Sequence, residues 1–130
     1  MFTIEEIKEA HAVVKSGVDF PLYVQKLIEL GVESYTSFVV DGHTEYFGTD
    51  GYAIQSNANY EPLTVAASSD QKKFMERLAT HQTGGSDYVT FCQDTASAGI
   101  EKWVVDMKVM TCTYYDRAGA VMLAEVIPLP

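Results

Sequence analysis

The 130-residue sequence has little basic charge and no long hydrophobic segment. Nine Lys and Arg residues face eighteen Asp and Glu residues, the net charge is −9, and the longest basic run is Lys72-Lys73. Nucleic-acid binding requires clustered bases that displace phosphate counterions, so we expect no contact with DNA or RNA. No apolar run reaches the roughly 18 residues of a membrane helix, and the N-terminal MFTIEEIKEAH has acids where a signal peptide has bases. These absences favour a cytoplasmic protein without membrane contact.

Cysteine is also scarce, with only Cys92 and Cys112 in the chain. Neither has the spacing of a zinc site, and we interpret both as small buried residues, with a disulfide as the less favoured alternative. No sequence pattern places a histidine base within hydrogen-bond distance of either thiol, so a cysteine nucleophile is not expected. The turn Gly84-Gly85-Ser86 lacks the lysine of a phosphate-binding loop. We therefore predict no cofactor and no metal.

One segment of the sequence occurs twice. DFPLYVQKLIELGVESY, residues 19–35, is similar to DYVTFCQDTASAGIEKW, residues 87–103. The residue numbers of every matching pair differ by the same amount as those of Asp19 and Asp87. We call this difference the repeat offset. Helix caps, glycine stops and the order of elements recur along it, which indicates an internal duplication. The matching pairs are Asp19/Asp87, Gln25/Gln93, Gly31/Gly99, Glu33/Glu101, Phe20/Tyr88, Tyr23/Phe91, Tyr35/Trp103 and Tyr46/Tyr114.

Apolar periodicity and turn residues predict the same order of elements in both halves. We expect helices from Ile4 to Gly17, from Asp19 to Gly31, at 71–80 and at 87–98. Strands are expected at 34–40, 44–47, 52–55, 102–107, 111–115 and 120–126, with a possible added strand at 63–66. The sequence thus predicts one α+β domain over residues 1–130. It consists of two α-α-β-β-β pseudo-repeats, 1–62 and 69–130, whose antiparallel strands pack against helices.

Four residues are candidates for catalysis. His43 and Glu45 lie two apart on a predicted strand and therefore share a face. Glu33 and Glu101 are repeat-equivalent acids, and a pseudo-twofold arrangement of the halves could bring them together. The alternative is structural: His43 and Glu45 form a polar strand face beside a turn, and the two glutamates cap backbone or lie in solvent.

The predicted strands are apolar on both faces. One face forms the core: Tyr35, Val39, Trp103, Val105 and Met107. The opposite face is too apolar to be fully wet, so the other half, the helices or a second subunit should cover it. We expect a homodimer, and a ligand pocket is the less favoured alternative. The interface candidates are Phe38, Val40, Phe47, Tyr115 and Leu123.

Several motifs resemble a known family of small bacterial proteins. They are FxxYVxxLxxLGVExY (20–35), DGHTEYFG (41–48), YEPLTVA (60–66), EKWVVDM (101–107) and MTCTYYDRAG (110–119). The chain resembles the YdfO-like domain-of-unknown-function proteins, which often carry the label "phage envelope protein". The resemblance implies a cytosolic α+β domain of enterobacterial genomes and prophages. It implies no activity and no catalytic residues.

Three functional hypotheses follow. The leading one is a non-enzymatic binding or regulatory module for a protein partner or a small ligand, for example a modulator that docks on a basic host protein. The second is a small enzyme with a carboxylate and histidine site between the two halves. The third is a structural component of a phage.

Overall fold

The computed structural model describes residues 1–14 and 17–128, and residues 129–130 of the predicted second repeat lie outside them. The order α-α-β-β-β occurs twice, with 3-10 turns at Gly17–Asp19 and Thr49–Gly51. The helices are α1 (Ile4–His11), α2 (Phe20–Leu30), α3 (Gln71–Gln82) and α4 (Tyr88–Ser97). The strands are β1 (Ser34–Phe38), β2 (Thr44–Phe47), β3 (Ala53–Gln55), β4 (Ile100–Asp106), β5 (Thr111–Asp116) and β6 (Val121–Val126).

Local signals in the sequence fix most helix ends. Thr3 and Glu6 form a capping box at α1, in which each side chain accepts a hydrogen bond from the other residue's backbone amide. Asp70 and Asp87 cap α3 and α4 by accepting hydrogen bonds from backbone amides. Gly31 ends α2 with φ of +98°, in the left-handed region that glycine adopts without strain.

All six strands form one antiparallel sheet in the order β3-β2-β1-β4-β5-β6. The two halves meet at the β1–β4 pair, where Thr36 lies opposite Val104, its own counterpart at the repeat offset. The outer pairings follow the same offset, because Tyr35 faces Tyr46 in β2 and Trp103 faces Tyr114 in β5.

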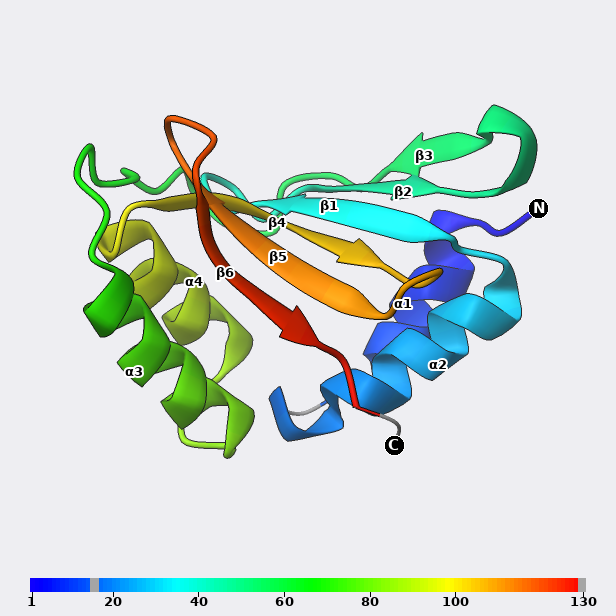
Figure 1. The fold of residues 1–130 in the computed structure, drawn as a ribbon. Coiled ribbons are helices and arrows are strands. Elements are labelled where there is room, and N and C mark those ends of the chain that lie inside the picture. The colour runs from blue at the N-terminus through cyan, green and yellow to red at the C-terminus, as the bar shows by residue number, and fades with distance from the viewer. Residues whose placement is uncertain (15–16, 129–130) are drawn as a thin grey trace.

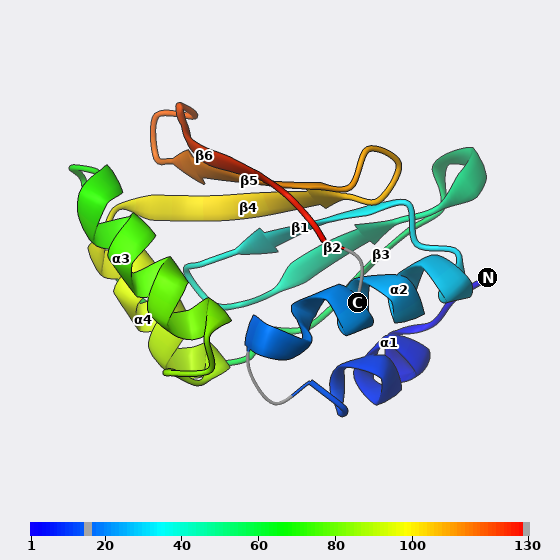
Figure 2. The same cartoon turned by 60° about the horizontal axis from the view of Figure 1, so that its bottom comes forward.

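The four helices lie on one face of the sheet, which we call the inner face; the other is the outer face (Figure 1). The α1–α2 pair and the α3–α4 pair sit under different parts of the sheet, and the 3-10 turn before α2 contacts α3 (Figure 2). Fully buried side chains beneath the sheet include Leu27, Phe74 and Ile100. No helix within residues 1–14 and 17–128 is long and apolar enough to cross a membrane.

The structure changes three details of the expected fold. Helix α1 ends at His11, before the predicted stop; residues 15–16 lie outside the described part. Strand β1 ends at Phe38 because the chain turns at Val39–Val40, and residues 63–66 form no strand. Leu63 instead makes a single backbone hydrogen bond to the carbonyl of Val40, at 2.6 Å.

A β-bulge changes the faces of β6. The register shifts between Tyr114 and Tyr115, so Tyr115 pairs with Val121 whereas Tyr114 pairs with Leu123. Residues directly opposite each other in a sheet share a face, and Tyr114 is on the inner face. Leu123 therefore lies on the inner face, so its expected position on the face opposite the core was wrong, because the bulge interrupts the alternation of faces.

Candidate functional site

A cavity of about 710 Å³ lies between the two helix pairs and the inner face of the sheet. Residues from both halves line it, so neither half alone forms its wall. Its lining is mostly aromatic and aliphatic, with polar groups at both ends. The lining residues include Lys8, His11, Ala12, Phe20, Tyr23, Tyr35, Ser37, Thr44, Tyr46, Ser56, His81, Gln82, Tyr88, Phe91, Trp103, Cys112, Tyr114 and Glu125.

Two groups of three aromatic rings, one group from each half, form part of the cavity wall. In the first half, ring centroids are 6.3 Å apart for Tyr23–Tyr35 and 5.7 Å apart for Tyr35–Tyr46. In the second half, they are 5.9 Å apart for Phe91–Trp103 and 6.0 Å apart for Trp103–Tyr114. Each ring of the second group follows its counterpart by the repeat offset. The groups differ in chemistry, since the first carries three phenols and the second only one.

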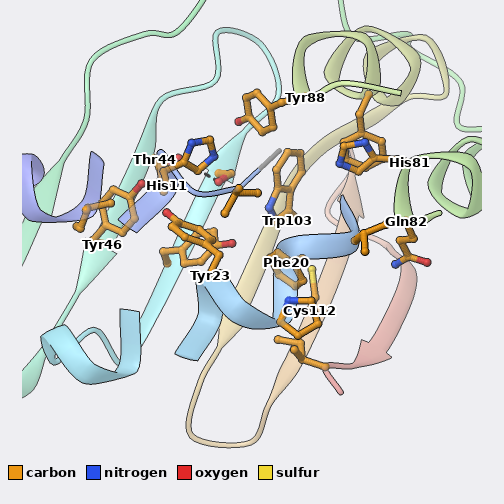
Figure 3. A pocket seen from close by; sticks show the side chains of 18 of the residues that line it. His11, Phe20, Tyr23, Thr44, Tyr46, His81, Gln82, Tyr88, Trp103 and Cys112 are labelled. Atoms are coloured by element: carbon orange, nitrogen blue, oxygen red, sulfur yellow. Dashed lines mark hydrogen bonds between the residues drawn. The ribbon is translucent and has the colours of Figure 1, made fainter. Parts of the chain in front are cut away.

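The end of the cavity beside β2 is polar. The hydroxyls of Ser37 and Thr44 hydrogen-bond each other at 3.0 Å, and both residues are buried. The Ser56 hydroxyl accepts a hydrogen bond from the Thr44 backbone amide at 2.9 Å. Figure 3 shows His11 beside Thr44, with Tyr46 and Tyr88 on either side. This end can hydrogen-bond a polar atom of a ligand.

The other end of the cavity, beside β6, contains a carboxylate. The amide Nε2 of Gln82 on α3 donates a hydrogen bond to Glu125 Oε1 on β6, at 3.1 Å. Glu125 lies opposite Cys112 in the register, and both face inward. Gln82 and His11 lie on opposite sides of the cavity (Figure 3).

Burial keeps the titratable groups of the cavity mostly uncharged. It raises the pKa of Tyr23 and Tyr46 above the ordinary value for tyrosine, so both stay protonated phenols at neutral pH. Desolvation also raises the pKa of the Cys112 thiol to about 12. The pKa values of His11 and His81 are lowered, in each case chiefly by desolvation, so both favour the neutral imidazole.

The structure does not bring Glu33 and Glu101 together. The Glu33 carbonyl accepts a hydrogen bond from Met107, and the Glu101 carbonyl accepts one from Val39. These points are at opposite ends of the β1–β4 pair, separated by six residues of strand, or roughly 20 Å. Because β1 and β4 pair antiparallel, residues related by the repeat offset lie at opposite ends of this strand pair. Glu33 forms an ion pair with Lys108 at 3.5 Å.

His43 and Glu45 also have separate surroundings. The His43 ring pairs with Asp41 through Nδ1 and stacks on Phe38, with 4.5 Å between centroids. Burial opposes ionisation of Asp41, but hydrogen bonds and charge from His43 outweigh it and lower the pKa of that carboxyl. Glu45 is opposite Thr36 on the outer face. None of the four catalytic candidates lines the cavity.

Four of the five interface candidates lie on or beside the outer face. Phe38 and Val40 line a shallow groove with Leu63 and Val65 from the connection between β3 and α3. Val40 and Phe47 are exposed, whereas Tyr115 is half-buried beneath Lys102, whose Nζ lies 5.6 Å from the ring centroid. Leu123, the fifth, is inside.

Sequence reasoning treated the cavity rings as core and missed the cavity itself. The signal that could have found them was the recurrence of aromatic residues at the repeat offset, together with His11 and His81 on apolar helix faces. Nothing in the sequence marked Glu125 as a cavity residue, because an acidic residue near the end of a strand is common. Among the described residues, no three His, Cys, Asp or Glu side chains gather so as to hold a metal ion.

Comparison with known proteins gives a family without an assigned activity. No curated protein matches the chain. A family model described as "Protein of unknown function (DUF1398)" matches residues 8–126, which is most of the sequence. The match agrees with the expected resemblance to a domain of unknown function. The chain belongs to the DUF1398 family.

Proposed function

We propose that the protein is a non-enzymatic module that binds a small, largely apolar molecule in the cavity between the helix pairs and the sheet. One observation carries the proposal: the cavity measures about 710 Å³ and is lined by aromatic rings from both halves. Ligand sites typically span roughly 300–1,000 Å³, with apolar walls and a few polar groups that orient the ligand. The Ser37–Thr44 pair and Glu125 are groups of that kind.

The chemistry of the lining favours binding over catalysis. A cysteine nucleophile must be a thiolate, and burial keeps the Cys112 thiol protonated. Glu33, Glu101, His43 and Glu45 are absent from the cavity wall and do not form one cluster. The enzymatic alternative therefore receives no support from the positions of its candidate residues.

We also infer that the two halves are copies of one ancestral unit. The β1–β2 and β4–β5 registers share the repeat offset, which supports this, as do the two aromatic groups. A single unit has three strands and one helix pair, which leave one side of the cavity open. The proposed binding site therefore exists only when both copies are joined. Divergence of the copies explains the different chemistry of its two ends.

The single tryptophan, Trp103, provides a direct test because it lines the cavity. We would titrate the protein with the neutral probe 4′-tert-butyl-4-hydroxybiphenyl and follow Trp103 fluorescence excited at a wavelength selective for tryptophan. Saturable binding is expected. Ala12, the residue after α1, is exposed and lines the cavity, and the larger ring of Ala12→Phe should weaken binding at least about tenfold by taking space that the probe needs.

The matched control is Ala53→Phe, which makes the same substitution at an exposed position of β3 outside the cavity lining. This variant should bind the probe like the original chain. Absence of saturable binding up to the solubility limit of the probe would overturn the proposal. Equal loss in both variants would also contradict it, because the loss would then not come from filling the cavity.

The homodimer expected from the sequence would form through the outer face of the sheet, not through the cavity. Val40 and Phe47 remain exposed there, and the helices all lie on the inner face. Light scattering on a size-exclusion column, at low and high salt, tests this prediction. A salt-resistant dimer that Phe47→Glu converts to monomer would support it. Large assemblies would favour the phage structural hypothesis, and a strict monomer would leave the face open to a host protein.

A further inference from the structure

The ligand class can be narrowed further, on the basis of the proposed binding function. We propose that the cavity recognises a ring-bearing organic cation, such as a quaternary or protonated tertiary amine, with its charged nitrogen at Glu125. Among the described residues that line the cavity, Glu125 is the only carboxylate. It comes from β6 and lies opposite the buried Cys112, so it is on the inner face of the sheet.

Glu125 has a hydrogen-bond partner but no counter-charge. Gln82 donates to it at 3.1 Å, and this neutral amide fixes the position of the carboxylate without neutralising it. Within residues 1–14 and 17–128, no lysine, arginine or histidine forms an ion pair with Glu125. A half-buried carboxylate without a counter-charge is stabilised by a cation, so a positively charged ligand would supply what the protein itself does not.

Aromatic rings next to this end suit the same ligand. Trp103 and Tyr114 are neighbours, with 6.0 Å between their centroids, and Phe20 lines the cavity on the helix side. The faces of such rings carry negative potential and attract organic cations. Quaternary ammonium groups are commonly held by several aromatic rings near a carboxylate, because they are weakly hydrated and make no directional hydrogen bonds.

The charges at the two ends would orient the ligand. Lys8 lines the cavity on α1, one turn before His11, and His11 lies across the cavity from Gln82 (Figure 3). Lys8 and Glu125 are thus the oppositely charged side chains among the described lining residues, and they come from different elements, α1 and β6. A cation is attracted to Glu125, while a hydroxyl or carbonyl of the same molecule can reach the Ser37–Thr44 pair. The overall charge of −9 adds a general attraction for cations.

The test uses two ligands of the same shape. One is the neutral 4′-tert-butyl-4-hydroxybiphenyl, and the other carries trimethylammonium in place of tert-butyl. Dissociation constants come from calorimetry and from Trp103 fluorescence. We expect the cation to bind about tenfold more tightly than the neutral ligand, as expected for a desolvated cation–aromatic contact assisted by a carboxylate. Glu125→Gln should remove most of this preference, measured as the ratio of the two dissociation constants within the same variant.

Glu76→Gln is the matched control, since it removes one negative charge from an exposed position of α3 outside the cavity lining. It should keep the preference for the cation. Equal affinity for the two ligands in the original chain would overturn the cation proposal while leaving the binding function intact. The same holds if Glu125→Gln and Glu76→Gln reduce the preference equally, because the effect would then be one of net charge. Failure of both ligands to bind would overturn the binding function itself.

Discussion

The ring of His81 stacks on the ring of Phe91, with 4.3 Å between centroids and 13° between the planes. In the other half, His11 meets Tyr23 edge-on, with centroids 5.1 Å apart. Tyr23 and Phe91 are counterparts at the repeat offset, and each belongs to the second helix of its pair. Each half thus places a histidine from its first helix against this aromatic position. Both histidines line the cavity.

Stability should decrease as the pH falls below about 6.5. Desolvation lowers the pKa of His81, although Ser86 and Asp87 oppose the shift, and desolvation lowers that of His11. Between the folded pKa and the ordinary value of about 6.5, the unfolded chain binds more protons than the folded chain. The stabilisation is therefore complete above that window and is lost as the pH falls through it. Urea unfolding at pH 7.5 and 5.5 measures the difference.

His81→Phe isolates the contribution of one histidine. The substitution keeps an aromatic ring against Phe91 but removes the titrating group, so the loss of stability between pH 7.5 and 5.5 should become smaller. The pKa values of Asp41 and Asp87 are lowered from values already near 4, so both carboxyls titrate below this window. An unchanged or larger pH dependence in His81→Phe would refute the prediction.

The buried hydrogen bond between Ser37 and Thr44 should show strong energetic coupling. Ser37→Ala leaves the Thr44 hydroxyl without this partner in a buried site, which should cost about 1–2 kcal/mol in the free energy of unfolding. Thr44→Val should cost a similar amount. The double variant should cost about 1 kcal/mol less than the sum, because removing both partners leaves no unsatisfied hydroxyl. Strict additivity in urea unfolding would show that the bond is not formed in solution.

Gly99→Ala should destabilise the protein more than Gly31→Ala. Both glycines have positive φ, +84° and +98°, so alanine is strained at either position, by about 1–2 kcal/mol. A Cβ at Gly99 would also lie 2.6 Å from the Ser68 carbonyl oxygen and 2.7 Å from Ser69 Cα, whereas a Cβ at Gly31 would have no neighbour within 4 Å. The backbone clash should add about 1–3 kcal/mol. If thermal and urea unfolding show equal losses of stability for Gly99→Ala and Gly31→Ala, the close approach of Gly99 to Ser68 and Ser69 would be contradicted.

Local interactions explain why much of the fold was predictable. The Thr3–Glu6 capping box, the Asp70 and Asp87 caps and the Gly31 stop each involve residues close in sequence, so a short stretch of sequence contains what fixes these helix ends. The two cysteines are buried and free, as interpreted from their surroundings. The core face was also correct, because Tyr35, Val39, Trp103, Val105 and Met107 are all buried and strand alternation requires only a period of two.

The site depended on information that a sequence pattern does not contain. Glu33 and Glu101 are equivalent in sequence, yet antiparallel pairing of β1 and β4 separates them. A single bulge at Tyr114–Tyr115 moves Leu123 to the inner face. His43 was grouped with Glu45 by spacing, but a turn places its ring against Asp41 and Phe38. The first two outcomes depend on chain direction and strand register, which are set by contacts between distant residues, whereas the His43 contacts depend on the conformation of the turn between β1 and β2.

The sequence by itself determined the order of the elements, most helix ends and the core face of the strands, because propensity, capping and apolar periodicity act within a few residues along the chain. Only the tertiary structure decided that the aromatic positions of both halves line a cavity, and that His11 lies across it from Gln82, the hydrogen-bond partner of Glu125. A cavity is the volume left where packed layers do not fully meet. Its size and lining therefore depend on how the helix pairs sit against the sheet, which no local pattern encodes.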